Sequence, residues 1–368
     1  MIDTAWPPTR AAALQRLAAV DAAAYARSRN HLEGAVTGLS PYLTHGLLSV
    51  PECLEALRLP PQHKLVYEFG WREYFRHVWV HRGEGILHSL HPGPLSDAAY
   101  AAELPQDIRR GATGVPVVDE AVRTLYARGW LHNHARLWLA SYVVHARKVH
   151  WRAGADWMLA HLLDGDLGSN HLSWQWVAGT ASHKPYLFDA ANVARFAPPP
   201  WHSEGSAIDL ERGALEALAR EPRSLAAGRG VGVEEPALTN LPQEASTAEP
   251  LPGADLWLAH PWALGEAPAG TTVVALVLKE AHGQQPWSRQ RWAWVQSRMA
   301  ALSPRRWVVD RAGLVAALRG AARVRTLANP HISPWLPEGV QALPEPRHFP
   351  DPECCCSSFS KWWSRVSR

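Results

Sequence analysis

The chain has 368 residues, of which 47% are hydrophobic and 19% are charged, and its formal net charge is +3. Length and composition predict two globular domains and exclude a disordered chain. Charged residues or histidines interrupt every apolar run before it reaches membrane-spanning length, and the N-terminus has no secretion signal, so we expect a cytoplasmic monomer. The small positive charge permits an anionic partner without requiring one.

Cysteine and tryptophan usage narrow the possible chemistry. Cys53 stands alone and residues 354–356 are three consecutive cysteines, a spacing unlike that of zinc or iron–sulfur sites, so we predict no metal. Reduced thiols in a reducing compartment are the simpler interpretation. The 19 tryptophans are more than a packed core usually needs, which favours aromatic stacking, cofactor enclosure or electron transfer.

In chain order, residues 9–220 have helical periodicity and few strand signals. The clearest expected helices cover 130–150 and 156–163, and the second ends at an Asp-Gly-Asp turn. Residues 221–253 are rich in Pro, Ala, Gly and Glu, which predicts a linker. Its Gly-Arg-Gly-Val-Gly stretch (228–232) lacks the preceding strand and following helix that a nucleotide-binding loop would need.

Strand and helix signals alternate after residue 253. We expect strands at 255–259, 271–278, 306–309 and 324–327, and helices at 287–302 and 313–318. This alternation is typical of a small α/β domain with a parallel, Rossmann-like sheet. The expected organisation is a helical domain (1–220), a linker (221–253) and a small α/β domain (254–368).

Four stretches of the helical half carry groups suited to a bound cofactor. Small and hydroxyl residues at 37–43 precede a helix and can donate to a phosphate. Glu68 lies three residues before Trp71 on one helix face, which places a hydrogen-bonding group beside a stacking surface. Arg136 ends the stretch 130–136 and is suited to pair with a buried carboxylate. The fourth stretch, 162–180, holds Asp164, Asp166, Asn170, Trp174 and Trp176.

In this order and spacing, the four stretches resemble the FAD-binding domain of the DNA photolyase and cryptochrome family, over about residues 20–200. The Trp-Arg-Glu-Tyr (71–74), Gly-Trp-Leu-His-Asn (129–133) and Asp-Gly-Asp…Asn…Trp-Gln-Trp (164–176) motifs carry the resemblance. It implies a mainly α-helical fold of photolyase type with FAD as cofactor, in a short form without the usual N-terminal antenna domain. The cofactor-binding residues that it implies are Tyr25, Thr37, Gly38, Leu39, Ser40, Arg72, Asn133, Arg136, Asp164, Gly165, Asp166 and Asn170.

The resemblance also implies roles in electron transfer and catalysis. Trp174 and Trp151 match the first two electron donors of photoreduction, whereas the third family tryptophan has no counterpart. Tyr100 or another tryptophan could end this chain of donors. Asp164 is expected at the polar edge of the flavin, paired with Arg136. The catalytic set that the resemblance implies is Glu68, Asn170 (facing the flavin N5), Trp174 and Trp151.

On the substrate side, the resemblance implies a pocket for a flipped-out pyrimidine dimer in DNA. Its expected residues are Glu68, Trp71, Asn133, His134 and Trp176. The implied function is blue-light-driven, FAD-dependent repair of cyclobutane pyrimidine dimers by a deoxyribodipyrimidine photolyase. The alternative is a cryptochrome-type signalling flavoprotein that repairs nothing. A light-independent flavin oxidoreductase is disfavoured because the sequence shows no nicotinamide site.

The α/β segment is expected to be an antenna-like domain placed after the flavin domain. Its closing stretch, Ser-Ser-Phe-Ser-Lys-Trp-Trp-Ser-Arg-Val (357–366), resembles the end of the family's antenna domain. The segment is short, so we expect a structural role and no second chromophore. An unrelated α/β domain is the alternative.

Overall fold

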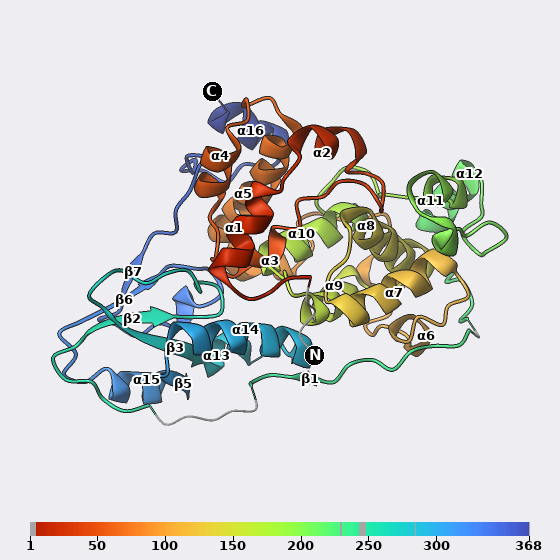
Figure 1. Ribbon diagram of the computed structural model, residues 1–368. Helices are drawn as coiled ribbons and strands as arrows, with labels where there is room; N and C mark the ends of the chain where they lie inside the picture. Colours follow the sequence, from red (N-terminus) through yellow and green to blue (C-terminus); the bar gives the residue numbers. More distant parts are fainter. Residues whose placement is uncertain (1–4, 229, 243–247, 284, 368) are drawn as a thin grey trace.

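The computed structural model describes residues 5–228, 230–242, 248–283 and 285–367. A helical part is followed by an α/β part beside it (Figure 1). The helices of the first part are α1 (Arg10–Ala18), α2 (Ala22–Ser28), α3 (Ser40–Thr44), α4 (Val50–Leu57), α5 (Lys64–Arg82), α6 (Gln106–Arg109), α7 (Pro116–Arg128), α8 (Asn133–Ser141), α9 (Trp151–His161), α10 (Leu167–Ala178), α11 (Ala190–Phe196) and α12 (Arg212–Arg220).

Local sequence signals fix the ends of the helices that matter for the site. The Asp166 carboxylate caps α10 by accepting from the Ser169 N–H at 2.8 Å. Gly179 ends the same helix with a φ of 79°, a left-handed conformation that glycine adopts without strain. Pro116 occupies the first turn of α7, where its missing N–H costs no hydrogen bond.

Two predicted helix boundaries were wrong. The helix expected at 130–150 begins at Asn133, because the His132 side chain caps it by accepting from the His134 N–H. It continues as a π-helical turn over Tyr142–Ala146 and breaks at Lys148, whose φ is 52°. The helix expected at 156–163 is α9, which begins five residues earlier; apolar periodicity alone does not mark such ends.

The α/β part contains a five-stranded parallel sheet in the order β5-β3-β2-β6-β7. Its strands are β2 (Asp255–Ala259), β3 (Thr272–Leu278), β5 (Arg306–Val309), β6 (Arg323–Leu327) and β7 (Gln341–Leu343), and its helices are α13 (Lys279–His282), α14 (Arg289–Leu302) and α15 (Arg311–Ala317). Strand β7 was not predicted, because it is short and lacks an apolar run. The observed fold confirms the predicted fold class: mainly helical with a small parallel α/β part.

The predicted linker is an extended strap on the helical part, although Arg229 and residues 243–247 lie outside the described residues. The Glu235 carboxylate pairs with Arg109 at 2.6 Å and with His161 at 3.2 Å. Leu238–Thr239 (β1) then pairs antiparallel with Trp287–Ser288 (β4). The strap therefore joins both parts through specific contacts.

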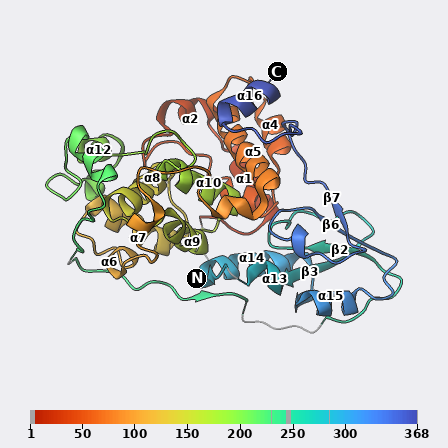
Figure 2. The ribbon, with the colours of Figure 1, turned by 180° about the vertical axis from the view of Figure 1, so that it is seen from behind.

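After β7 the chain returns to the helical part. Its last helix, α16 (Phe359–Val366), packs on α5 and lies far from the sheet in both ribbon views (Figures 1 and 2). Residues 345–363 therefore pack along α5, in the first part of the chain.

Buried side chains form two separate clusters that do not follow the order of the chain. The first cluster combines α1, α4 and α5 with the α/β part and α16. The second lies within residues 108–218 and includes Trp138, Trp151 and Trp174. Among the described residues, no helix is long and apolar enough to cross a membrane.

Candidate functional site

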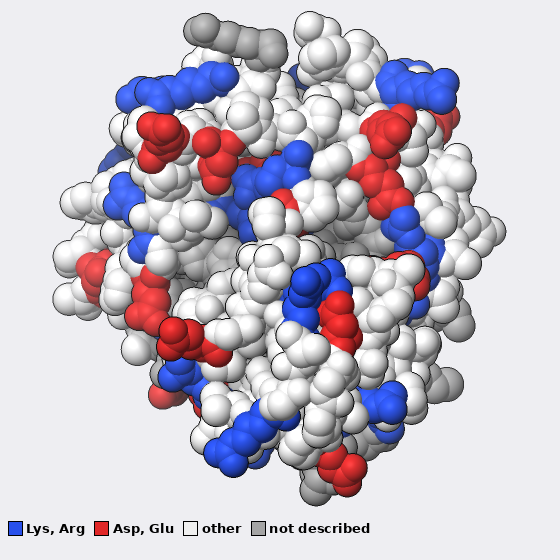
Figure 3. Space-filling model, turned by 90° about the vertical axis from the view of Figure 1, so that its left-hand side faces the viewer, with Lys and Arg blue, Asp and Glu red and all other residues white. Residues whose placement is uncertain are grey.

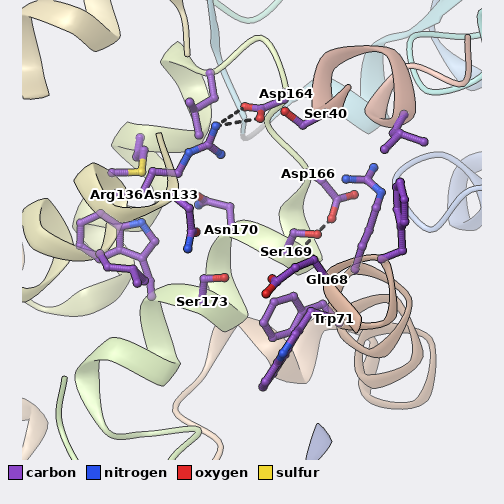
Figure 4. A pocket seen from close by; sticks show the side chains of 18 of the residues that line it. Ser40, Glu68, Trp71, Asn133, Arg136, Asp164, Asp166, Ser169, Asn170 and Ser173 are labelled. Carbon is purple, nitrogen blue, oxygen red and sulfur yellow. Dashed lines mark hydrogen bonds and ion pairs between the residues drawn. The ribbon is translucent and has the colours of Figure 1, made fainter. Parts of the chain in front are cut away.

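A cavity of about 270 Å³ lies where the two clusters meet (Figure 4). Helix α5 supplies one wall, and α8, α9 and α10 supply the opposite wall. Many residues predicted from the sequence line this cavity: Tyr25, Thr37, Ser40, Glu68, Trp71, Arg72, Asn133, Arg136, Asp164, Asp166, Asn170 and Trp174.

One end of the cavity contains a buried ion pair. Arg136 Nη2 donates to both carboxylate oxygens of Asp164, at 2.7 and 3.0 Å, and the Asp164 side chain is 2% exposed. Arg136 Nε also donates to the Leu131 carbonyl at 2.9 Å, which fixes the guanidinium plane. The pair predicted from the sequence is therefore present. Its carboxylate offers acceptor positions to an N–H group at the polar edge of a planar ligand.

A second charged pair lies beside the first turn of α10. Burial acts to raise the pKa of Asp166, but the charge of Arg72 and hydrogen bonds from Ser169 outweigh it and lower the pKa to about 2. Arg72 Nη2 donates to the Thr44 hydroxyl at 3.2 Å. Arg72 brings positive charge to the wall on which Thr37 and Ser40 present hydroxyls, a donor set that suits phosphate.

Asn170 and Trp174 line the α10 side of the cavity. Asn170 Nδ2 donates to the Ala155 carbonyl at 2.8 Å, which holds the amide against the wall. Trp174 is buried against Gly154, where an added Cβ would lie 2.4 Å from the indole ring. Gly154 was missed from the sequence, because a glycine inside a helical pattern gives no sign of what it contacts.

Trp151 and Tyr100, the electron donors expected beyond Trp174, both lie outside the cavity lining. Trp151 is buried and donates its indole N–H to Ser89 Oγ at 3.0 Å, but it does not line the cavity. His150 lies 5.5 Å from the Trp151 ring and 6.4 Å from the Tyr100 ring, measured between ring centroids. The structure thus places Tyr100 near Trp151 with His150 between them.

The two tryptophans predicted to flank a substrate are placed differently. Trp71 lines the cavity, and its ring stacks on Phe359 of α16 with centroids 4.0 Å apart and an interplanar angle of 11°. Trp176 is 36% exposed, does not line the cavity, and lies 5.7 Å from Tyr186. Phe359 was not predicted at the site, because its segment was assigned to the end of the α/β domain.

Glu68, Asn133 and His134 were the polar residues predicted at the substrate end, and the first two line the cavity. Glu68 pairs with Arg29 at 3.2 Å, and burial raises its pKa against the opposing charges of Arg29 and Lys64. His134 is neutral at pH 7, because burial first and then the nearby Arg29 lower its pKa to about 4. Asn133 begins α8 and lines the cavity.

Three of the predicted cofactor residues do not line the cavity. Gly38 has a φ of 61° and lies against the Arg16 side chain, and Leu39 is fully buried. Gly165 packs against Leu159 and Arg291. These three residues pack within the loops around the cavity and do not form its surface.

Among the described residues, one group of three has atoms close enough to hold a metal: His77, His81 and Asp351, within 4.8 Å of one another. The backbone N–H of Cys356 donates to His77 Nε2 at 2.9 Å, so the ring proton must lie on Nδ1. That nitrogen donates to Asp351 at 2.6 Å. Because both ring nitrogens are engaged, the group works as a hydrogen-bond bridge. The cysteines form no disulfide within the described chain.

The face shown in Figure 3 carries basic and acidic side chains interspersed across its surface. Such a mixture matches the small net charge and produces no field of a single sign over that face. Any anionic partner met there would be recognised through local contacts.

Comparison with known proteins supports the sequence resemblance. Residues 65–199 match the family described as the FAD binding domain of DNA photolyase. The deoxyribodipyrimidine photo-lyase of Streptomyces griseus is 35% identical over 162 residues, which cover 43% of this chain and 35% of that protein. Cryptochrome DASH of Oryza sativa subsp. japonica is 32% identical over 169 residues, covering 43% of this chain and 29% of that protein. The crystal structure of a Synechocystis sp. PCC6803 cryptochrome aligns with 26% identity and a TM-score of 0.45, covering 51% and 43% of the two chains.

The chain spans about a third of the length of the curated relatives that it matches. The matched residues include α5, α8, α9 and α10, which form most of the cavity wall. Fold and site therefore define a flavoprotein with a helical FAD-binding domain. Over residues 65–199, the chain carries an FAD-binding domain similar to that of the DNA photolyase and cryptochrome family. The predictions of the family and of FAD as cofactor are confirmed.

Proposed function

We propose that the protein is a DNA photolyase that uses FAD and blue light to split cyclobutane pyrimidine dimers. The observation that carries this proposal is one cavity with two unlike ends. The Asp164–Arg136 pair forms a polar end, and Glu68 and Trp71 of α5 form an end with a stacking surface and a hydrogen-bonding group. When bound, FAD supplies the light-driven electron transfer to the dimer and back.

The residues around the cofactor bind and orient it. The buried Asp164–Arg136 pair fits the polar edge of the ring system, and Arg72 with the hydroxyls of Thr37 and Ser40 fits the phosphates. Apolar side chains of the α8 and α9 wall, such as Leu137 and Met158, exclude water from the remaining surface. This donor set matches the chemistry of FAD.

The substrate end would hold two covalently linked pyrimidine bases that are extruded from the duplex. Trp71 offers a ring for stacking, and Glu68 and Asn133 offer groups for the base edges. A damaged step with weakened stacking is the easiest to extrude from a duplex, which would give selectivity for lesions.

The test uses purified protein reduced chemically in the dark and then illuminated with an oligonucleotide containing one dimer. The proposal expects the dimer to be converted to two pyrimidines under blue light and not in the dark. Trp71→Ala should weaken dimer binding by about 1–3 kcal/mol, because a stacking surface is lost. Photoreduction of oxidised FAD should be unchanged in this variant.

A cryptochrome-type signalling role is the second candidate. The neutral His134 and the position of Trp176 outside the cavity favour it, since both weaken a contact expected with DNA. A wild-type protein that photoreduces normally but leaves the dimer intact would support this role and reject repair.

We also propose that the α/β part docks on the helical part as an antenna domain would. Its role would be structural, without a second chromophore. The cavity at the carboxyl ends of β2 and β6 measures only about 110 Å³, too small for a second chromophore. Trp262 fills this crevice, sandwiched between His282 and His331 at centroid distances of 5.0 and 4.3 Å. A visible absorption spectrum fully accounted for by FAD is the expected result.

A further inference from the structure

Residues 345–351 are held on α5 by two charged pairs and one hydrogen bond from a histidine to a carboxylate. Glu345 binds Arg76 at 2.7 Å, Arg347 pairs with Glu73, and Asp351 accepts from His77 Nδ1 at 2.6 Å. The Cys356 backbone adds two hydrogen bonds, donating to His77 at 2.9 Å and accepting from the Tyr74 hydroxyl at 3.3 Å. These contacts lead the chain along α5 toward its first turns.

Helix α16 then packs its aromatic face on α5. Phe359 is 4% exposed and Trp362 is fully buried, so the helix is held by its own core contacts. Trp363 lies so close to Gly70 that an added Cβ would come within 2.4 Å of its ring. Tyr67 contacts both Phe359 and Trp363 edge to face, at 4.7 and 5.3 Å. Gly70 therefore allows an approach that any side chain at this position would prevent.

This packing determines which face of the Trp71 ring is accessible from the cavity. Phe359 covers one face of the Trp71 ring in a near-parallel stack, while Trp71 also lines the cavity. Phe75, on the same helix, lies 5.4 Å from the Trp71 ring. An indole held by two neighbours cannot rotate toward α16 without displacing Phe359. The surface that it leaves for a ligand is therefore the surface on the cavity side.

We propose that Phe359 is a positioning residue for Trp71, so that the C-terminal helix completes the wall on which a pyrimidine base stacks. This inference rests on the proposed function. Phe359 would not touch the substrate; it would hold the ring that does. A site on the helical domain would then depend on a residue nearly 290 positions away in the sequence.

The test compares Phe359→Leu with Phe349→Leu as a matched control. Phe349 is a buried phenylalanine of the same segment that contacts Trp362 and Trp363, and no contact with Trp71 is seen within the described residues. The proteins are labelled with 5-fluorotryptophan, and the ¹⁹F signal of Trp71 is assigned by its loss in Trp71→Phe. We expect Phe359→Leu to shift and broaden this signal and Phe349→Leu to leave it in place. An unchanged Trp71 signal in Phe359→Leu would overturn the proposal.

Binding of a dimer-containing oligonucleotide in the dark provides the second measurement. Phe359→Leu should weaken binding about three- to tenfold, since a stacked aromatic pair is lost, with FAD content unchanged. Tighter binding than wild type would show that α16 obstructs the pocket, and would also overturn the proposal. Failure of the wild-type protein to bind the oligonucleotide would instead reject the proposed function, while the ¹⁹F measurement still decides the position of Trp71.

Gly70→Ala perturbs the same contact from α5. Its methyl group would meet Trp363, so we expect the same change in the Trp71 signal as in Phe359→Leu. Alanine otherwise favours a helix interior over glycine by roughly 0.5–1 kcal/mol. A Gly70→Ala protein with a wild-type Trp71 signal would contradict the role of α16.

Discussion

The cavity and the crevice at the edge of the sheet are both positions where such folds bind ligands, yet only one is open. The cavity is lined by charged and aromatic groups from two clusters. The crevice is filled by Trp262 between two histidines, and Arg291 lies 3.7 Å from the ring centroid of Trp287. The fold thus provides two positions where a ligand could bind, and the side chains at each position determine whether it is accessible.

The filled crevice also supports the open cavity. Arg291 Nη1 donates to the Leu159 carbonyl at 3.0 Å, and its Nη2 donates to the Gly165 carbonyl at 2.6 Å. Gly165 stands between Asp164 and Asp166, so the α/β part holds the loop that carries both acids. Burial lowers the pKa of Arg291 to about 9, and the charges of Asp164 and Asp166 oppose this decrease. The two regions are therefore mechanically coupled.

Asp164→Ala should have the largest effect on the open cavity. It leaves Arg136 partly buried without its carboxylate, and losing one partner of a buried pair costs on the order of 3–5 kcal/mol. We expect FAD content to fall from about one per chain to less than about one tenth, consistent with a loss of that size. The ratio of flavin to protein absorbance after gel filtration measures it. Asp97→Ala, at an exposed acid, is the control, and full occupancy in Asp164→Ala would disprove the placement of the site.

Trp262→Ala, in the filled crevice, should lower the free energy of unfolding by a similar amount. It should not change the FAD content. Removing a buried tryptophan costs about 3–5 kcal/mol. Urea unfolding followed by circular dichroism measures this loss, with Trp335→Ala at an exposed position as control. Equal urea midpoints for Trp262→Ala and Trp335→Ala would show that the ring of Trp262 does not stabilise the crevice.

Low pH should weaken the filled crevice. Burial, with Arg291 adding to it, lowers the pKa of His282 to about 3, and burial lowers that of His260 to about 4. An unfolded histidine binds its proton near pH 6.5, so unfolding takes up protons between about pH 6.5 and 4 and stability falls as pH falls through this window.

Each such histidine contributes a slope of about 1.4 kcal/mol per pH unit within that window. Urea midpoints measured at pH 7.5 and 5 should therefore differ less for His282→Phe than for the wild type. His348→Gln, at an exposed histidine, should keep the wild-type difference. Equal pH dependence in His282→Phe and wild type would show that folding does not lower the pKa of His282.

Trp174→Phe should have the smallest effect, about a tenfold slower photoreduction of oxidised FAD under blue light, or about 1.4 kcal/mol in the barrier. The reason is that the oxidisable ring on the α10 side of the cavity is lost. Repair by FAD reduced beforehand with dithionite should continue. Trp292→Phe, at a buried ring of the crevice, is the control. Equal slowing in both variants would mean that the crevice also supplies electrons.

Sequence patterns predicted the groups of the site that short motifs carry. The Asp164–Arg136 pair, Glu68 and Trp71 on α5, and Asn133 on α8 all come from such motifs. Trp176 shows the limit of such motifs. It lies two residues after Trp174 on α10, where a helix turns by roughly 200°, so the two rings cannot face the same cavity.

Contacts between distant segments were not predictable. The stack of Phe359 on Trp71 and the hydrogen bonds of Arg291 to the loop at Gly165 depend on how the α/β part docks. No local periodicity encodes such docking. The helix ends at Asn133 and Trp151 were also missed, since caps made by histidine are weak sequence signals.

The division of the molecule into two clusters has a consequence for its synthesis. The cluster within residues 108–218 can close as soon as those residues have left the ribosome, whereas the cluster around α5 contains side chains from the α/β part and α16. At roughly 5–20 residues per second, the ribosome needs on the order of 10–40 s to proceed from Trp174 to Phe359. During that interval α5 lacks the contacts that α16 and the α/β part provide. The nascent chain therefore leaves exposed the apolar surface of α5 that only these later residues cover.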